Sequence, residues 1–276
     1  MLNIDKKTNS DLRFGFGNNW KRFLSHLDEN HINRAKKSLR EMLKVNDLTG
    51  KSFLDIGSGS GLFSLAAMKL GAVTVYSFDC DLQSVVCTSE LKKKFLPDSN
   101  NWTVKQGSVL NKNYLNTLGQ FDIVYSWGVI HHTGNMWQAL NNIIPLVKNG
   151  GVLFIALYND QGIISSIWKI VKIIYNKLPK FLKTFYVLFI MIIFEFKHFI
   201  ANLFSGKKQE TSQSERGMNK YRDWVDWVGG YPFEVAKPDD IIRFYLKNGF
   251  TLKKLKTCGK GYGNNEFVFM KIKCAE

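Results

Sequence analysis

The sequence predicts a doubly wound α/β fold, in which a mostly parallel sheet of seven strands lies between two layers of helices. From Lys51 onward, short apolar runs alternate with stretches of helical period, which is typical of a parallel sheet. The first apolar run leads directly into three closely spaced glycines, where such folds turn from strand to helix. With 276 residues, 45% of them hydrophobic, the chain is long enough to bury a large core.

Residues 1–50 are expected to form a polar, mostly helical cap. Apolar residues recur there at spacings of three and four, as one face of an amphipathic helix requires: Leu24, Leu27, Ile32, Ala35, Leu39, Met42 and Leu43. The first residues lack the basic-then-apolar order of a signal peptide, and the four cysteines show no CxxC spacing. We therefore expect a cytoplasmic protein without a disulfide framework or a metal site.

The sheet is expected to come from residues 51–162 and 223–276. Five strands are predicted in the first segment, at 52–56, 73–78, 102–106, 121–126 and 151–157, with helices at 61–70, 82–95 and 135–147. The second segment adds a helix at 237–248, which begins on the Pro-Asp-Asp order favoured at helix N-termini, and strands at 250–257 and 266–272.

Residues 163–222 interrupt this alternation and are expected to form a basic, apolar helical insertion. They hold eleven Lys and Arg residues but only three acidic ones, which gives more than half of the net charge of +15. Ser165, Lys169, Lys172 and Asn176 share one helical face, and apolar residues lie elsewhere on the helix: Ile167, Ile170, Val171, Ile174 and Leu178. After Pro179, the apolar run at 185–194 is too short to span a membrane. The insertion is expected to be a substrate lid, an element on an anionic membrane surface, or a hairpin buried against the core or a dimer partner.

The glycines of the first strand-to-helix turn predict a site for a nucleoside-type cofactor. Gly57, Gly59 and Gly61 follow Asp55, and glycine permits both positive φ and a close approach of ligand to backbone. Asp79 ends the second strand, 18 residues after Gly61, where a carboxylate can bond both ribose hydroxyls. The spacing differs from the Gly-x-Gly-x-x-Gly of dinucleotide enzymes.

This pattern resembles the first motif of class I S-adenosylmethionine (SAM)-dependent methyltransferases, an acidic residue followed by Gly-x-Gly-x-Gly. The resemblance covers roughly residues 51–157 and 237–273. It implies SAM as the cofactor, with Asp55 supporting the methionine end and Asp79 holding the ribose. The expected cofactor contacts also include Gly57, Ser58, Gly59, Gly61 and Trp127. The family often has Gly-Asp after the third strand, whereas this chain has Gly107 and Ser108, so Ser108 is the expected adenine contact.

Residues 121–132 resemble the Phe-Asp…Val-Leu-His-His segment of small-molecule methyltransferases, notably the ubiquinone and menaquinone biosynthesis type. His131 or His132 is a candidate general base, because imidazole can remove a proton from an oxygen nucleophile near neutral pH. The alternative is a structural role for one or both, as a cap of the helix that begins at Asn135 or as a hydrogen-bonded core residue. Expected substrate contacts are Tyr158, Asn159, Asp226 and Tyr231, although the aromatic segment at 223–234 could equally pin the insertion to the core.

The predicted function is SAM-dependent methylation of an oxygen in a small or lipid-linked acceptor, by a protein that can attach peripherally to the inner face of the membrane. One alternative is a SAM-binding module without turnover that anchors at a membrane or recruits a partner. Another is a nucleic-acid methyltransferase, which the positive charge favours. The chain lacks the Asn/Asp-Pro-Pro-Tyr motif of amino-methylating nucleic-acid enzymes, so nucleic acid is not the expected partner.

Overall fold

The computed structural model describes residues 14–15, 24, 27–205, 220–259 and 263–272. Most of the first 26 residues of the expected N-terminal cap, and residues 206–219 of the insertion, lie outside the described residues. The chain divides into two units: Met1–Phe14 with Ile163–Pro232, and Gly15–Gly162 with Phe233–Glu276. Residues 223–232, which the sequence analysis grouped with the sheet, belong to the first of these.

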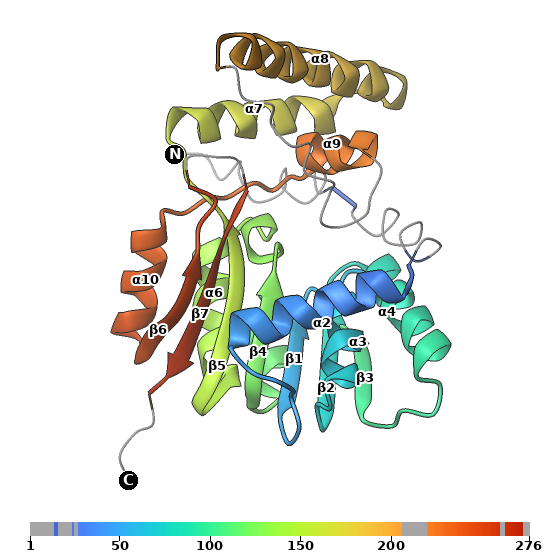
Figure 1. Cartoon of the computed structure of the whole chain (residues 1–276), viewed down its shortest axis with the longest axis vertical. Helices are drawn as coiled ribbons and strands as arrows, with labels where there is room; N and C mark the ends of the chain where they lie inside the picture. The colour runs from blue at the N-terminus through green and yellow to red at the C-terminus, as the bar shows by residue number, and fades with distance from the viewer. Residues whose placement is uncertain (1–13, 16–23, 25–26, 206–219, 260–262, 273–276) are drawn as a thin grey trace. The chain divides into compact units, whose positions relative to one another are not determined.

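The larger unit is built on one seven-stranded sheet in the order β3-β2-β1-β4-β5-β7-β6 (Figure 1). The strands are β1 (Ser52–Ile56), β2 (Thr74–Asp79), β3 (Trp102–Gln106), β4 (Phe121–Trp127), β5 (Val147–Tyr158), β6 (Phe250–Lys256) and β7 (Asn264–Lys271). Neighbouring strands from β3 to β5 are parallel, and β7 runs antiparallel to both β5 and β6. The predicted mostly parallel sheet of seven strands is therefore confirmed.

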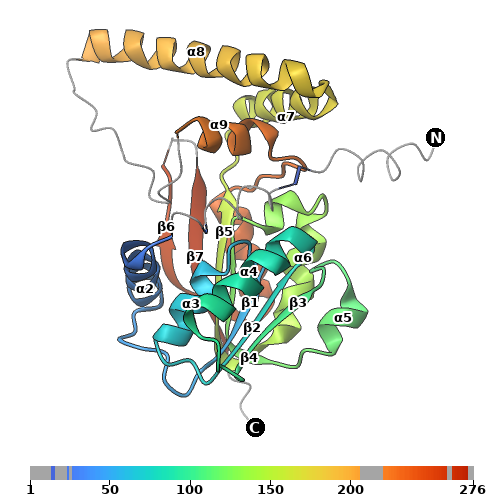
Figure 2. The same ribbon diagram turned by 90° about the vertical axis from the view of Figure 1, so that its right-hand side faces the viewer.

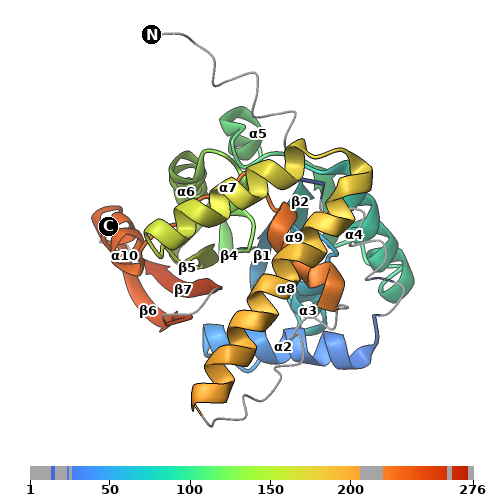
Figure 3. The same cartoon turned by 90° about the horizontal axis from the view of Figure 1, so that it is seen from above.

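Helices cover both faces of this sheet, as the fold class requires (Figures 1 and 3). One layer holds α2 (Glu29–Leu43), α3 (Leu62–Lys69) and α4 (Leu82–Phe95), and the other holds α5 (Lys112–Asn116), α6 (Met136–Ile143) and α10 (Pro238–Lys247). The central strands β1, β4 and β5 can be buried on both sides because most of their residues are apolar. Leu54, Val124 and Ile155 of the central strands, for example, are fully buried in the core that α6 and α10 complete.

Two elements differ from the sequence prediction. The helix expected through residue 147 ends at Ile143, because Pro145 lies in a 3-10 turn and cannot continue an α-helix. Val147 instead begins β5 and pairs with Phe121. Helix α5 was not predicted. It has five residues, too few to show a period, and the Asn111 side chain caps it by accepting a hydrogen bond from the Tyr114 backbone N–H at 3.1 Å.

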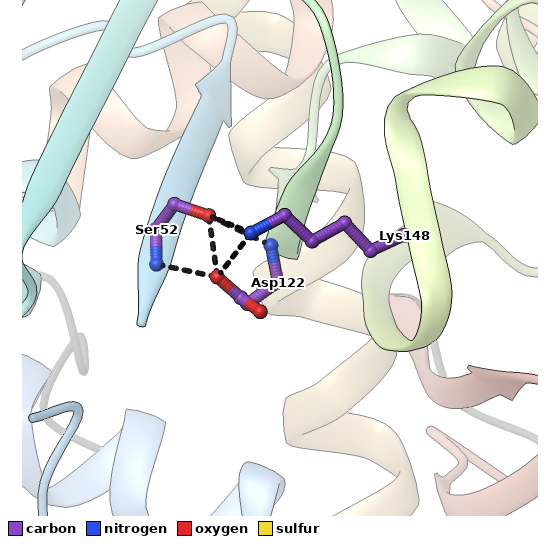
Figure 4. A network of polar contacts seen from close by, with 3 residues as sticks. All are labelled: Ser52, Asp122 and Lys148. Carbon is purple, nitrogen blue, oxygen red and sulfur yellow. Dashed lines mark hydrogen bonds and ion pairs between the residues drawn. The ribbon is translucent and has the colours of Figure 1, made fainter. Parts of the chain in front are cut away.

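A polar network joins the starts of β1 and β4 to the early part of β5 (Figure 4). Asp122 Oδ2 accepts hydrogen bonds from Ser52 N at 2.9 Å, Ser52 Oγ at 2.6 Å and Lys148 Nζ at 2.9 Å. Burial raises the pKa of Asp122, but the bonds from Ser52 and Lys148 outweigh it and lower the pKa to about 2. This network lies at the amino ends of the strands, so the carboxyl ends remain for a ligand site.

The smaller unit consists of α7 (Ile163–Lys177), α8 (Lys180–Ser205) and α9 (Lys220–Gly229) (Figure 2). Trp168 of α7 packs against Phe194 of α8 and Trp227 of α9, with ring centroids 5.0 and 5.3 Å away. Val187 and Ile190 of α8 are also buried. No helix within the described ranges combines the length and the apolar character that crossing a membrane requires.

Candidate active site

The loop between β1 and α3 adopts a conformation that only glycine tolerates well. Gly57, Gly59 and Gly61 have φ angles of 77°, 56° and 79°. A Cβ atom at Gly57 would lie 2.4 Å from the Val129 side chain, and one at Gly61 would lie 2.8 Å from Thr88. The loop is therefore enclosed by the segment after β4 and by α4, and its glycines cannot be replaced without displacing one of them.

Thr88 of α4 holds this loop, and no local pattern around Thr88 predicts this contact. Ser58 Oγ lies 2.9 Å from Thr88 Oγ1, and Thr88 Oγ1 donates to the carbonyl of Gly59 at 3.2 Å. Ser58, a predicted cofactor contact, thus helps to hold the glycine loop against α4 through its hydrogen bond with Thr88. Because the backbone is held in place before any ligand arrives, its shape is preorganised.

Asp79 lies beside the glycine loop at the carboxyl end of β2. Its Oδ2 accepts from the backbone N–H of Gly59 at 3.0 Å, and its Oδ1 accepts from that of Asp81 at 2.9 Å. Burial raises its pKa, and the bonds from Asp81 and Gly59 oppose that change. A carboxylate accepts about four hydrogen bonds, so both oxygens keep capacity for hydroxyl donors of a ligand.

The loop after β3 adjoins Asp79. The Gly107 N–H donates to the Asp79 carbonyl at 2.9 Å, which brings Ser108 to the same edge of the sheet. Ser108 is half-buried and its Oγ accepts from the Leu110 N–H at 3.2 Å, which leaves the hydroxyl hydrogen available as a donor. Trp127, the last residue of β4, is also half-buried at this edge.

Asp55 lies beneath the glycine loop and is only 2% exposed. Its Oδ2 accepts from Ser64 Oγ at 2.5 Å, and Ser64 Oγ lies 2.6 Å from Ser77 Oγ. Burial raises the pKa of Asp55 to about 7, against the lowering effect of the Ser64 bond. Asp55 therefore fastens α3 to β1 and β2, and its role at the methionine end of SAM stays a prediction.

The two histidines occupy a 3-10 turn, Ile130–His132, directly after β4, but their environments differ. His131 is fully buried, and its Nδ1 accepts from the backbone N–H of Tyr158 at 3.2 Å while its ring stacks on the Tyr158 ring at 3.8 Å. A neutral His131 thus carries its proton on Nε2, and it cannot take a second proton without breaking the bond to Tyr158. His132 is half-buried, and its ring stands perpendicular to that of Tyr158 at 5.3 Å. His132 is accordingly the better placed base.

The segment that follows the insertion packs against Tyr158 and the turn that carries the two histidines. Phe233 packs on Tyr158 with ring centroids 5.3 Å apart, and the Glu234 N–H donates to the His131 carbonyl at 3.0 Å. The Glu234 carboxylate accepts from the Met136 N–H at 3.0 and 3.1 Å and so caps α6. The sequence did not predict that Glu234 caps α6 or that it bonds the histidine turn. Glu234 and Met136, for example, are 98 residues apart in the chain.

The other three predicted substrate residues have structural partners. Asn159 Oδ1 accepts from Asn265 at 3.0 Å, which ties the end of β5 to β7. Asp226 and Tyr231 belong to the smaller unit, where the Tyr231 carbonyl accepts from the Phe14 N–H at 2.9 Å and the Asp226 carboxylate acts electrostatically on Lys172. Tyr158 is therefore the predicted substrate residue that lies beside the histidines.

Comparison with known protein families identifies residues 27–185, more than half of the chain, as a methyltransferase domain. The chain is 28% identical over 161 residues to tRNA U34 carboxymethyltransferase of Enterobacter sp. (strain 638), and 31% identical over 129 residues to ribosomal protein L11 methyltransferase of Prochlorococcus marinus (strain MIT 9515). These matches cover 58% and 44% of this chain. They span only about two fifths of the length of either relative, 41% and 40%.

Solved structures with the same fold include magnesium protoporphyrin IX methyltransferase of Synechocystis PCC 6803 with bound SAH. Its TM-score is 0.57 at 14% identity, over 96% of this chain and 98% of that one. An O-methyltransferase family protein from Burkholderia thailandensis has a TM-score of 0.54 at 9% identity, over 88% of this chain and 58% of that one. The family match over more than half of the chain shows that the chain belongs to the methyltransferase domain family.

Proposed function

We propose that this methyltransferase transfers a methyl group from SAM to an oxygen atom of a small or lipid-linked acceptor. The observation that carries the proposal is the position of His132, at the carboxyl edge of the sheet. Val129, whose carbonyl accepts from the His132 N–H at 2.9 Å, packs over Gly57 of the glycine loop. A half-buried imidazole is thus held next to the predicted cofactor loop.

The residues around this loop fit SAM. When bound, SAM supplies an electrophilic methyl group on a positively charged sulfur. The Asp79 carboxylate offers acceptors that match the two ribose hydroxyls, and Ser108 offers a hydroxyl donor at the neighbouring strand end. The fixed loop around Gly59 would hold the remainder of the cofactor without further ordering, which favours binding.

His132 would act on the acceptor rather than on SAM. An oxygen nucleophile must lose its proton as the methyl group arrives, and a positioned imidazole contributes roughly 10²–10⁴-fold to such a step. Alignment of acceptor oxygen, methyl carbon and sulfur would supply most of the remaining acceleration. His131 would serve as a positioning residue, because it holds Tyr158 and the turn that carries His132.

Two features support a small or lipid-linked acceptor. Residues 121–132 resemble the corresponding segment of small-molecule methyltransferases, and the rings of Tyr158 and Phe233 offer an aromatic wall beside the histidines. The net charge of +15 and the similarity to a tRNA-modifying enzyme favour nucleic acid instead. The aromatic wall makes the small acceptor the better choice.

Labelled methyl transfer from SAM into a fractionated lysate tests this proposal. We expect the label in the small-molecule or lipid fraction, resistant to nuclease and protease, and lost with the His132→Ala variant. Label that nuclease removes would identify a nucleic-acid methyltransferase. SAM binding without label in any fraction would identify a module without turnover.

A further inference from the structure

We propose that the α7–α8 hairpin docks on the surface of an anionic phospholipid membrane through one apolar face. The hairpin face is defined here as the exposed apolar side chains of α7 and α8: Ile163, Ile164, Ile167, Ile170 and Ile174, and Phe181, Leu182, Phe185, Leu188, Phe189, Ile192 and Ile193. The inference concerns the smaller unit alone and does not depend on the acceptor.

Helix α7 departs from the usual arrangement for a helix at a protein surface. Some of its polar residues point inward although Lys169 and Lys177 are exposed: Lys172 is fully buried, and its Nζ donates to the Trp227 carbonyl of α9. Asn176 Nδ2 donates to the Gly229 carbonyl at 2.7 Å. The five isoleucines of the opposite side are 42–81% exposed. A water-facing helix normally buries such a stripe, so this one is built to meet an apolar phase.

Helix α8 continues the same surface. Its inner side packs on α7, where the Tyr186 ring lies 6.4 Å from that of Tyr175, and Val187 and Ile190 are buried. The seven apolar residues on its other side are 38–71% exposed. Figure 3 shows α7 and α8 as the two arms of a V, with α9 behind α8. Both exposed stripes therefore lie on the side away from the core that the three helices share.

The hairpin face is unusual within this protein. It contributes twelve of the nineteen large hydrophobic residues that are exposed in the described part of the chain. The other seven are scattered over the larger unit, as on most proteins. Twelve exposed apolar side chains concentrated on two packed helices mark an interaction site rather than ordinary surface.

The positive charge around the hairpin face indicates which kind of partner binds there. Residues 163–194 contain five lysines and no acidic residue. Lys169, Lys177 and Lys180 are exposed, and the last two flank the turn between the helices. An anionic lipid surface is complementary to both the lysines and the apolar stripe. Two copies meeting face to face would instead bring their lysines together, so a membrane fits better than a second copy.

Flotation of the full-length protein with vesicles tests the proposal. The protein should float with vesicles that contain phosphatidylglycerol, float less with pure phosphatidylcholine, and partly detach at high salt. Ile170→Gln with Phe185→Gln should lower partitioning more than ten-fold, because both side chains would enter the lipid. Lys177→Gln and Lys180→Gln should each lower binding to the anionic vesicles about five-fold, with little effect on neutral ones.

Leu246→Gln is the matched control, since Leu246 is 50% exposed on α10 and lies outside the hairpin face. It should float like the parent protein, and unchanged thermal unfolding of all variants would show that the fold is intact. The proposal is overturned if the parent protein stays unbound to anionic vesicles at low salt, or if Leu246→Gln reduces flotation as much as the hairpin variants. Dimers that Ile170→Gln dissociates, without vesicle binding, would assign the face to a second copy.

Discussion

His131 and His132 are neighbours in the sequence, but their side chains have different partners in the structure. The 3-10 turn directs His131 into the core, onto the Tyr158 backbone N–H, and leaves His132 half-buried at the edge of the sheet. The sequence could name the pair but could not separate them, because the partner of His131 comes from a strand 27 residues away. The division of roles gives a direct prediction.

His132→Ala should lower kcat roughly 10²–10⁴-fold and leave SAM affinity nearly unchanged, because the base is removed and the cofactor residues are not. His131→Ala should instead lower the free energy of unfolding by about 1–3 kcal/mol, since the Tyr158 N–H loses its buried partner. His131→Asn, which keeps an acceptor, should restore part of that stability. Single-turnover kinetics and denaturant titration measure the two effects. Wild-type turnover by His132→Ala would show that alignment alone drives the reaction.

Some residues of the cofactor site could be predicted from their neighbours in the sequence, and others act through contacts that are distant along the chain. Gly57, Gly59 and Gly61 could be predicted because they stand within five residues of one another at a strand end. Asp79 followed from the regular length of a strand-helix-strand unit. Thr88 and Glu234 could not be predicted, because they act through contacts with residues 29 and 98 positions away. Only the folded chain brings those contacts together.

At the scale of elements, the strands were the most predictable part of this protein. Strands β1 and β3 have the predicted bounds, and the ends of β2, β4 and β6 differ by one residue. The clear error was the start of β5, and Pro145 was the signal that could have prevented it. The direction in which α7 faces was beyond prediction, since a helical pattern shows two sides but not which one is buried.

The network of Ser52, Asp122 and Lys148 predicts an acid-sensitive contribution to stability. The folded pKa of Asp122, about 2, is below the ordinary 3.8, so the folded state holds the proton less tightly than the unfolded state. Its contribution is therefore complete above about pH 4 and is lost as the pH falls toward 2. Asp122→Asn should cost about 1–3 kcal/mol at pH 7 and little near pH 2. Urea unfolding across this pH range measures the difference, with exposed Asp98→Asn as the control. An equal cost at both pH values would rule out this account.

The buried Lys172 predicts that the stability of the smaller unit also rises with pH, but in a window at higher pH than that of Asp122. Burial lowers its pKa to about 7 from 10.5, and the Asp226 charge only partly offsets this. Between pH 7 and 10.5 the unfolded chain binds the proton that the folded chain lacks, so stability rises with pH across this window. The rise should be roughly 2–4 kcal/mol relative to Lys172→Met. Denaturant titration followed by tryptophan fluorescence checks it, with Lys169→Met as the control. Parallel pH profiles for parent and Lys172→Met would contradict the prediction.

At the scale of the whole molecule, the two units suggest complementary tasks. The larger one carries the glycine loop, Asp79 and His132, and the smaller one exposes the hairpin face. If the hairpin face binds a membrane and the acceptor is lipid-linked, both proposals describe an enzyme that works where its substrate is held. They are nevertheless tested apart, because flotation needs no turnover and methyl transfer in a lysate needs no vesicles.

Calorimetric titration with SAM tests the central claim most directly, because every assignment at the site depends on the cofactor. The parent protein should bind SAM with micromolar or tighter affinity and should not bind NAD. Asp79→Ala should weaken SAM binding by about 1.5–3 kcal/mol, or roughly 10- to 150-fold, since the ribose hydroxyls lose a charged acceptor. Asp98→Ala, an exposed carboxylate between α4 and β3, should leave the affinity unchanged. Binding of NAD without SAM, or full SAM affinity in Asp79→Ala, would contradict the account.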